Sequence, residues 1–139
     1  MQRTFWARVS SASLLLNVSP SRMQFFNALW DLGRAAAVAK AHDVILVIEN
    51  EYDCNVATGT ETRRLFAALP DRTLMHNWDP GNCIEAGENP FPDAWNQLDH
   101  SRIAHMHLKD SSGHGWLPIG GGKIDFAGQF RRLSPKRTM

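Results

Sequence analysis

The segment Asn77–Asn82 reads Asn-Trp-Asp-Pro-Gly-Asn, and it follows a short run, Leu74–His76, that is expected to belong to a strand. Pro80 fixes its own backbone φ angle and Gly81 adopts conformations that other residues avoid, so we expect a turn directly after Asp79. A carboxylate is therefore expected at the point where a strand ends and a loop begins.

Two other apolar runs end at residues that can bind a metal. Val44–Ile48 leads into Glu49, and Ile103–Leu108 carries His107 near its end. Asp79 lies 30 residues after Glu49 and 28 residues before His107. A closed barrel of eight βα units uses about 31 residues for each unit. The spacing therefore places three metal-capable side chains at the same edge of three successive units.

The remaining patterns predict an α/β fold. The expected strands cover 3–9, 44–48, 73–78 and 103–108, and the expected helices cover 20–41, 58–69, 92–98 and 125–133. This alternation predicts parallel βα units of an incomplete TIM (β/α)8 barrel, with about four strands and crossover helices. We predict one domain over residues 1–133, followed by a disordered basic tail over 134–139.

Composition excludes several classes of function. The chain has 139 residues and is 43% apolar, which suffices for one core. Its net charge of +1 offers no basic surplus for nucleic acid or an anionic membrane. Cys54 and Cys83 lack a metal-binding or disulfide spacing, and no apolar run approaches the ~20 residues of a membrane span. These features predict a cytoplasmic protein that binds neither nucleic acid nor membranes.

Each of the three metal-capable residues has an ordinary explanation when it is taken alone. An aspartate before Pro-Gly commonly forms a turn, a glutamate after a strand can mark the entry into solvent, and a single histidine often packs in a core. Their shared position favours a site, because barrel active sites lie at the carboxyl ends of strands. Carboxylates with imidazole suit Mn²⁺, Co²⁺, Mg²⁺ or Zn²⁺.

Three segments, Ile48–Glu51, Trp78–Asn82 and Ala104–Asp110, resemble signature segments of the sugar phosphate isomerase/epimerase family, whose members are xylose isomerase-like TIM barrels. The segment Pro118–Asp125 resembles the Gly-rich turn after the seventh strand of that family. The resemblance extends over about residues 3–133. It implies that this chain corresponds to the part of a barrel between strand four and helix seven.

By position, the resemblance implies that Glu49, Asp79 and His107 bind the divalent metal. In such enzymes the cation holds two oxygens of a small sugar or sugar phosphate and stabilises an enediolate while a proton leaves carbon. The resemblance makes Glu49 one catalytic acid/base of this isomerase or epimerase reaction. Relatives carry a second glutamate after strand eight, and no carboxylate follows Leu133. We therefore expect an activity that truncation impairs.

The resemblance also implies three residues on the substrate side. Asn82 falls where relatives place a polar residue that faces the sugar. His105 shares a face with His107 by the strand period of two, although packing explains it equally well. Lys109 can attract a phosphate or carboxylate, or it can mark a solvated strand end. Gly121 departs from the family, because many relatives have glutamate there.

Two other functions stay open: a barrel fragment without enzymatic activity, and a metal-dependent phosphodiesterase or endonuclease on the same barrel. The small Lys/Arg surplus disfavours the nuclease, because binding a phosphate backbone requires many cations. Metal stoichiometry separates the three, with one ion for the isomerase, none for the fragment and two or three for the nuclease. The sheet edges of an incomplete barrel, at strands 3–9 and 103–108, predict self-association.

Overall fold

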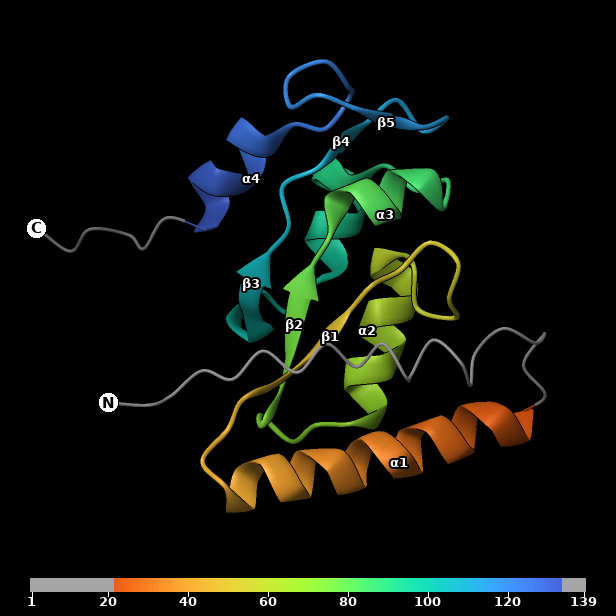
Figure 1. The fold of residues 1–139 in the computed structure, drawn as a ribbon, viewed down its shortest axis with the longest axis vertical. Helices are drawn as coiled ribbons and strands as arrows, with labels where there is room; N and C mark the ends of the chain where they lie inside the picture. The colour runs from red at the N-terminus through yellow and green to blue at the C-terminus, as the bar shows by residue number, and fades with distance from the viewer. Residues whose placement is uncertain (1–21, 134–139) are drawn as a thin grey trace, which may run out of the picture.

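A computed structural model describes residues 22–133 of the chain. Its main sheet contains three parallel strands in the order β1 (Leu46–Glu49), β2 (Leu74–Trp78) and β3 (Ile103–Met106). Figure 1 shows the three strands side by side, with α3 and the β4–β5 hairpin beyond their carboxyl ends. The three strands predicted for this region are confirmed, and the strand predicted over 3–9 lies outside the described residues.

The first two helices follow the predicted βα order. α1 (Arg22–Ala41) precedes β1, and α2 (Gly59–Ala68) connects β1 to β2. Thr58 is the N-cap of α2 and forms a reciprocal capping box with Glu61. This box satisfies backbone N–H groups that the first helical turn leaves unpaired, so the local sequence determines where α2 begins. No helix in residues 22–133 is long and apolar enough to cross a membrane.

The chain after β2 differs from the prediction. A turn leading into a loop was expected directly after Asp79, but α3 (Pro80–Glu85) begins there. Proline is well suited to the first helical position, because its φ angle is preset and its missing N–H is not needed there. The Asp79 side chain accepts a hydrogen bond from the Asn82 backbone N–H at 2.9 Å. The predicted turn is therefore the cap of a short helix.

Short helical turns complete the crossover from α3 to β3. They are η2 (Pro90–Ala94), η3 (Trp95–Gln97) and η4 (His100–Arg102). The single helix predicted over 92–98 is therefore wrong in detail. The prolines of this segment remove backbone donors that a continuous α-helix would use, which favours short turns instead.

The Gly-rich segment after β3 contains a small hairpin that the sequence did not predict. β4 (Asp110–Ser111) pairs in antiparallel fashion with β5 (Trp116–Leu117). The buried Asp110 carboxylate accepts hydrogen bonds from the backbone N–H groups of Gly120 at 2.9 Å and Gly122 at 3.0 Å. One carboxylate thus holds the following turn against the hairpin. The predicted last helix is present as α4 (Phe126–Leu133).

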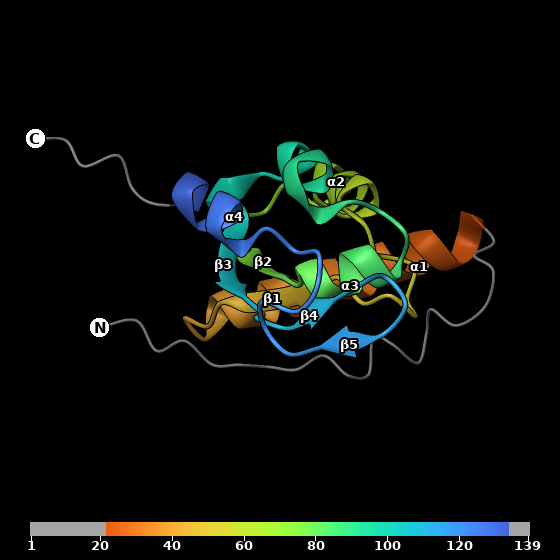
Figure 2. The same ribbon diagram turned by 90° about the horizontal axis from the view of Figure 1, so that it is seen from above.

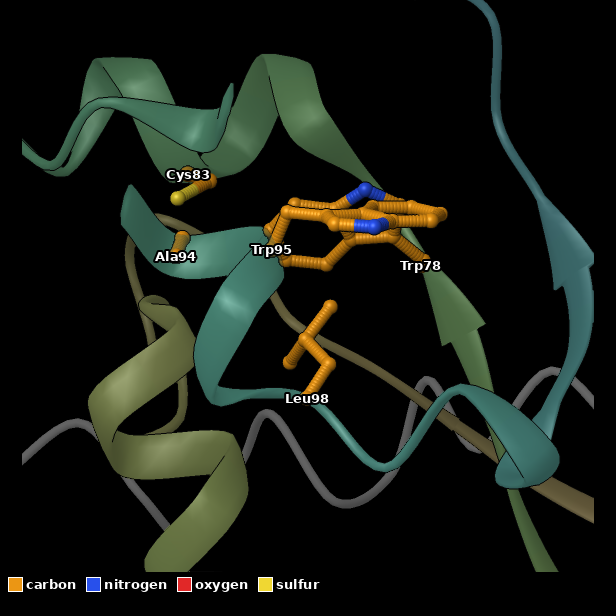
Figure 3. Close-up of a cluster of buried hydrophobic side chains, with 5 residues drawn as sticks. All are labelled: Trp78, Cys83, Ala94, Trp95 and Leu98. Carbon is orange, nitrogen blue, oxygen red and sulfur yellow. The ribbon is translucent and has the colours of Figure 1, made fainter. Parts of the chain in front are cut away.

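Two apolar clusters cover the helix-facing side of the sheet. One contains Trp78, Cys83, Ala94, Trp95 and Leu98 (Figure 3). The other joins α1 and α2 to the first two strands through Ala36, Leu46, Phe66 and Leu74. Figure 2, seen from above, places α2 and α4 on one side of the sheet and β5 on the other. The core therefore lies between the sheet and the helices, which leaves the other face of the sheet for polar residues.

An irregularity in β3 directs two histidines to that polar face. His76 pairs with Ile103, but the next residue of β2, Asn77, pairs with His105, so Ala104 is an extra residue. Ile103 packs against the tryptophan cluster, whereas the His105 ring lies 5.4 Å from the His107 ring on the other face. An extra residue of this kind re-aims the side chains that follow it.

Among the described strands, β3 pairs only with β2, so its second edge has no described partner. Self-association through a sheet edge stays a prediction.

Candidate metal centre

The carboxyl ends of the three strands bring Glu49, Asp79 and His107 together. Glu49 is the last residue of β1, Asp79 follows β2, and His107 follows β3. One candidate ligand atom of each residue lies within 4.8 Å of the other two. The Nδ1 atom of His107 lies 3.0 Å from Glu49 Oε1 and 3.1 Å from Asp79 Oδ2. Parallel strand order thus gathers residues that are 58 positions apart in the chain.

The two carboxylates of this cluster differ in their surroundings. The Asp79 side chain is fully buried, and its Oδ2 also lies 2.9 Å from Lys109 Nζ. Glu49 is partly buried, and this burial raises its pKa above the ordinary value, with a further increase from the Asp79 charge against the opposing effect of His107. Two neighbouring carboxylates with restricted access to water favour a bound cation.

Asn77 supports the centre from the middle of the sheet, and sequence reasoning missed it. Its Nδ2 donates a hydrogen bond to Glu49 Oε2 at 3.0 Å and lies 3.2 Å from His107 Nε2. With Nε2 as the acceptor, the His107 proton lies on Nδ1 and points toward the carboxylates. A polar side chain directly before Trp78, in a strand that also carries His76, was the available signal for this role.

Asn50 fixes the backbone of Asp79, and it too was missed. It is fully buried, and its Oδ1 accepts a hydrogen bond from the Asp79 N–H at 2.8 Å. Its Nδ2 donates to the Asp79 carbonyl at 2.8 Å and to the Ala57 carbonyl at 3.0 Å. Asn50 therefore locks the end of β1 to the end of β2. Its place directly after Glu49 was a signal, but its partner is 29 residues away.

The three residues predicted on the substrate side lie around the same cluster. Asn82 Nδ2 lies 3.3 Å from Glu49 Oε1, and its Oδ1 accepts a hydrogen bond from Lys109 Nζ at 2.9 Å. The His105 ring stands edge-on to the His107 ring. Burial lowers the pKa of His105, and His107 adds to this effect, so His105 favours the neutral form.

The donor set fits a divalent cation. It offers two carboxylates and one imidazole nitrogen, which suits Mn²⁺, Co²⁺, Mg²⁺ or Zn²⁺. Three protein ligands leave coordination positions open, as catalytic metal sites require. Binding at His107 Nδ1 would require that nitrogen to release its proton.

A family comparison agrees with this architecture. The family described as the xylose isomerase-like TIM barrel matches residues 17–137. The chain belongs to this family. No functionally curated protein matches it.

Solved structures place the chain within part of such barrels. The probable 3-DHS dehydratase AsbF from Bacillus anthracis aligns with a TM-score of 0.73 at 18% identity, over 83% of this chain and 48% of that one. D-allulose 3-epimerase from Methylomonas sp. aligns with a TM-score of 0.67 at 22% identity, over 85% and 42%. The zinc-bound IolI protein aligns with a TM-score of 0.66 at 16% identity, over 85% and 46%. The chain spans less than half the length of each, and these likenesses show its fold.

Proposed function

We propose that this chain carries the proton-transfer half of a metal-dependent isomerase or epimerase that acts on a small sugar or sugar phosphate. The observation that carries the proposal is the convergence of Glu49, Asp79 and His107 at the carboxyl ends of three parallel strands. Similarity to a D-allulose 3-epimerase supports the class of substrate, and similarity to the zinc-bound IolI protein supports the use of a metal.

In the proposed site, Glu49, Asp79 and His107 hold the divalent cation. When bound, such a cation supplies Lewis-acid polarisation of a substrate carbonyl. Polarisation acidifies the C–H bond beside the carbonyl, and the Glu49 carboxylate accepts that proton. Partial burial and the Asp79 charge raise the pKa of Glu49 in the chain without metal, and a bound cation would lower it. Return of the proton to the same carbon gives exchange, and return to the neighbouring carbon gives isomerisation.

The surrounding polar residues orient the reacting groups. Asn77 donates to Glu49 Oε2, which restricts the direction in which this carboxylate presents its oxygens. Asn82 borders the cluster through Glu49 and Lys109, where it can donate to a sugar hydroxyl. We assign to Lys109 the recognition of an anionic group of the substrate, and to His105 support of the His107 ring. Inversion of a carbon needs a second acid/base on the opposite face of the substrate.

Exchange of substrate hydrogen for solvent deuterium tests the proposal. The chain is loaded with Mn²⁺ or Co²⁺ and incubated in D₂O with ketoses and ketose phosphates. We expect slow, metal-dependent incorporation of deuterium at the carbon beside the carbonyl. Glu49→Gln should reduce it by about 10²–10⁴-fold, because a general base is lost.

Glu51→Gln is the matched control, because it makes the same change two residues further along the chain. It should leave exchange intact. Absence of metal-dependent exchange by the unmodified chain, or equal exchange by Glu49→Gln, would contradict the proposed activity.

A further inference from the structure

Lys109 contacts the most deeply buried ligand of the proposed centre. Its Nζ lies 2.9 Å from Asp79 Oδ2, and this same oxygen lies 3.1 Å from His107 Nδ1. The Asp79 side chain is 0% exposed, whereas that of Lys109 is 36% exposed. The ammonium therefore reaches from the solvent side to an oxygen that the metal would also need.

Charge balance explains this contact. Glu49 and Asp79 place two carboxylates beside one imidazole, and a cation is needed to offset their mutual repulsion. In the chain without metal, the Lys109 ammonium supplies this positive charge. A divalent cation on Asp79 Oδ2 would lie next to the ammonium. Two positive charges that close together repel strongly where water is scarce.

We propose that Lys109 is the internal counter-cation of Asp79, and that a divalent metal binds by displacing its ammonium from Asp79 Oδ2. This inference rests on the metal centre of the proposed function. The Lys109 ammonium then competes with the metal for Asp79 Oδ2 and so lowers the metal affinity. This role adds to its proposed recognition of an anionic group of the substrate.

The ammonium that pairs with Asp79 also contacts Trp116, and this second contact does not depend on the carboxylate. Lys109 Nζ lies 4.5 Å from the centre of the Trp116 ring, a favourable cation–π arrangement. Gly81 permits this approach, because a Cβ atom there would lie 2.9 Å from both Lys109 Cγ and Trp116 Cζ3. Trp116 is supported in turn by Tyr52, with ring centres 6.0 Å apart.

Metal binding and anion binding are then coupled. While Lys109 is paired with Asp79, its charge is neutralised and attracts a phosphate or carboxylate weakly. Once the metal occupies Asp79, the ammonium loses its carboxylate partner, and its charge can attract an anion beside Trp116 and Asn82, which it already contacts. The bound metal thus raises the affinity for an anion at this place. By thermodynamic linkage, a bound anion raises the affinity for the metal by the same factor.

The affinity for Mn²⁺ tests the proposal directly. Free Mn²⁺ is measured by electron paramagnetic resonance during titration of the full chain at pH 7. Lys109→Met should bind Mn²⁺ at least about tenfold more tightly than the unmodified chain, because the competing ammonium and its repulsion of the cation are gone. Lys40→Met is the matched control, since it removes the same charge from the exposed pair with Asp71. It should leave the affinity unchanged.

The direction of the effect separates competition from a structural role. Loss of a merely structural lysine would weaken metal binding, so unchanged or weaker binding by Lys109→Met overturns the proposal. Lys109→Gln, which keeps a polar group without charge, should also bind more tightly. These affinities are measured without substrate, so they stand apart from the deuterium exchange that tests the proposed function.

A measurement on the unmodified chain does not depend on any lysine variant. Closed-shell Zn²⁺ should change the tryptophan emission as the ammonium moves relative to Trp116. Trp116→Phe should abolish that change. Emission that does not respond to bound Zn²⁺ overturns the proposed displacement.

Discussion

Two histidines, the buried His76 and the partly buried His107, lie on opposite faces of the same sheet. His76 is 2% exposed between Phe66 and Trp78, with ring centres 5.7 and 5.6 Å away. Its Nε2 has no hydrogen-bond partner among the described residues, and burial lowers its pKa to about 3. His107 instead meets two carboxylates, Glu49 and Asp79. Burial alone makes an imidazole neutral, whereas carboxylates at the strand ends create a place for a cation.

Successive side chains of β2 point to opposite faces of the sheet, and this alternation separates the apolar core from the metal centre. Trp78 and His76 face the helices and belong to the side that stabilises the fold, and Asn77 between them supports the metal centre on the other side. The helix-facing side should therefore govern stability, and the opposite side should govern metal binding. Three substitutions test that division.

The largest effect on stability is expected from Trp95→Ala in the helix-facing core. Trp95 is fully buried against Trp78 and Leu98 (Figure 3). Removing a buried indole should lower the free energy of unfolding by about 3–5 kcal/mol, measured by urea denaturation. Trp30→Ala is the control, because Trp30 is 70% exposed, and it should change stability by about 0.5 kcal/mol or less. Loss of metal binding by folded Trp95→Ala would contradict the claim that the two faces of the sheet govern stability and metal binding separately.

A smaller loss of stability, together with a loss of metal binding, is expected from Asn50→Ala. The change removes the three hydrogen bonds of the Asn50 side chain and leaves both backbone groups of Asp79 without this partner. We expect about 2–3 kcal/mol of destabilisation and 10–100-fold weaker Mn²⁺ binding, since Asp79 is no longer held in place. Exposed Asn96→Ala should change neither quantity. Undiminished metal affinity in folded Asn50→Ala would show that Asp79 is positioned by other contacts.

The smallest effect at neutral pH is expected from His76→Leu. The pKa of His76 is about 3 in the folded chain and near 6.5 when unfolded, so the unfolded chain binds the extra proton between these values. Stability should therefore fall as the pH decreases below about 6.5, by up to ~1.4 kcal/mol per pH unit from this residue. His76→Leu should differ little at pH 7 and lose less stability toward pH 4.

Thermal melts between pH 4 and pH 7 measure this slope, with exposed His42→Leu as the control. Equal slopes for His76→Leu and the unmodified chain would show that His76 is not held neutral by its surroundings.

Local and periodic signals were enough to predict the sheet and the convergence of its strand ends. The apolar runs predicted the three described strands, and the helix expected over 58–69 is present as α2, with Thr58 as its N-cap. The spacing of about one βα unit placed Glu49, Asp79 and His107 at one edge, because parallel strands present their carboxyl ends together. Each inference needed only residues within one unit and the repeat between units.

The missed features depend on contacts that local patterns do not contain. The Asn50 side chain pairs with Asp79, 29 residues away, and Asp110 organises backbone groups up to 14 residues later. The extra residue Ala104 becomes visible only when β3 is paired with β2. At Pro80 the local signal was ambiguous, because proline begins turns and helices alike.

Metal stoichiometry tests the central claim most directly. The metal-free chain is titrated with Co²⁺ and followed by calorimetry and visible absorption. We predict one ion bound per chain, and none bound by Asp79→Ala. Asp79→Asn, which keeps a side chain able to cap α3, should also lose the ion if the carboxylate itself is the ligand. Two or more ions per chain, or undiminished binding by both Asp79 variants, would contradict a centre built from Glu49, Asp79 and His107.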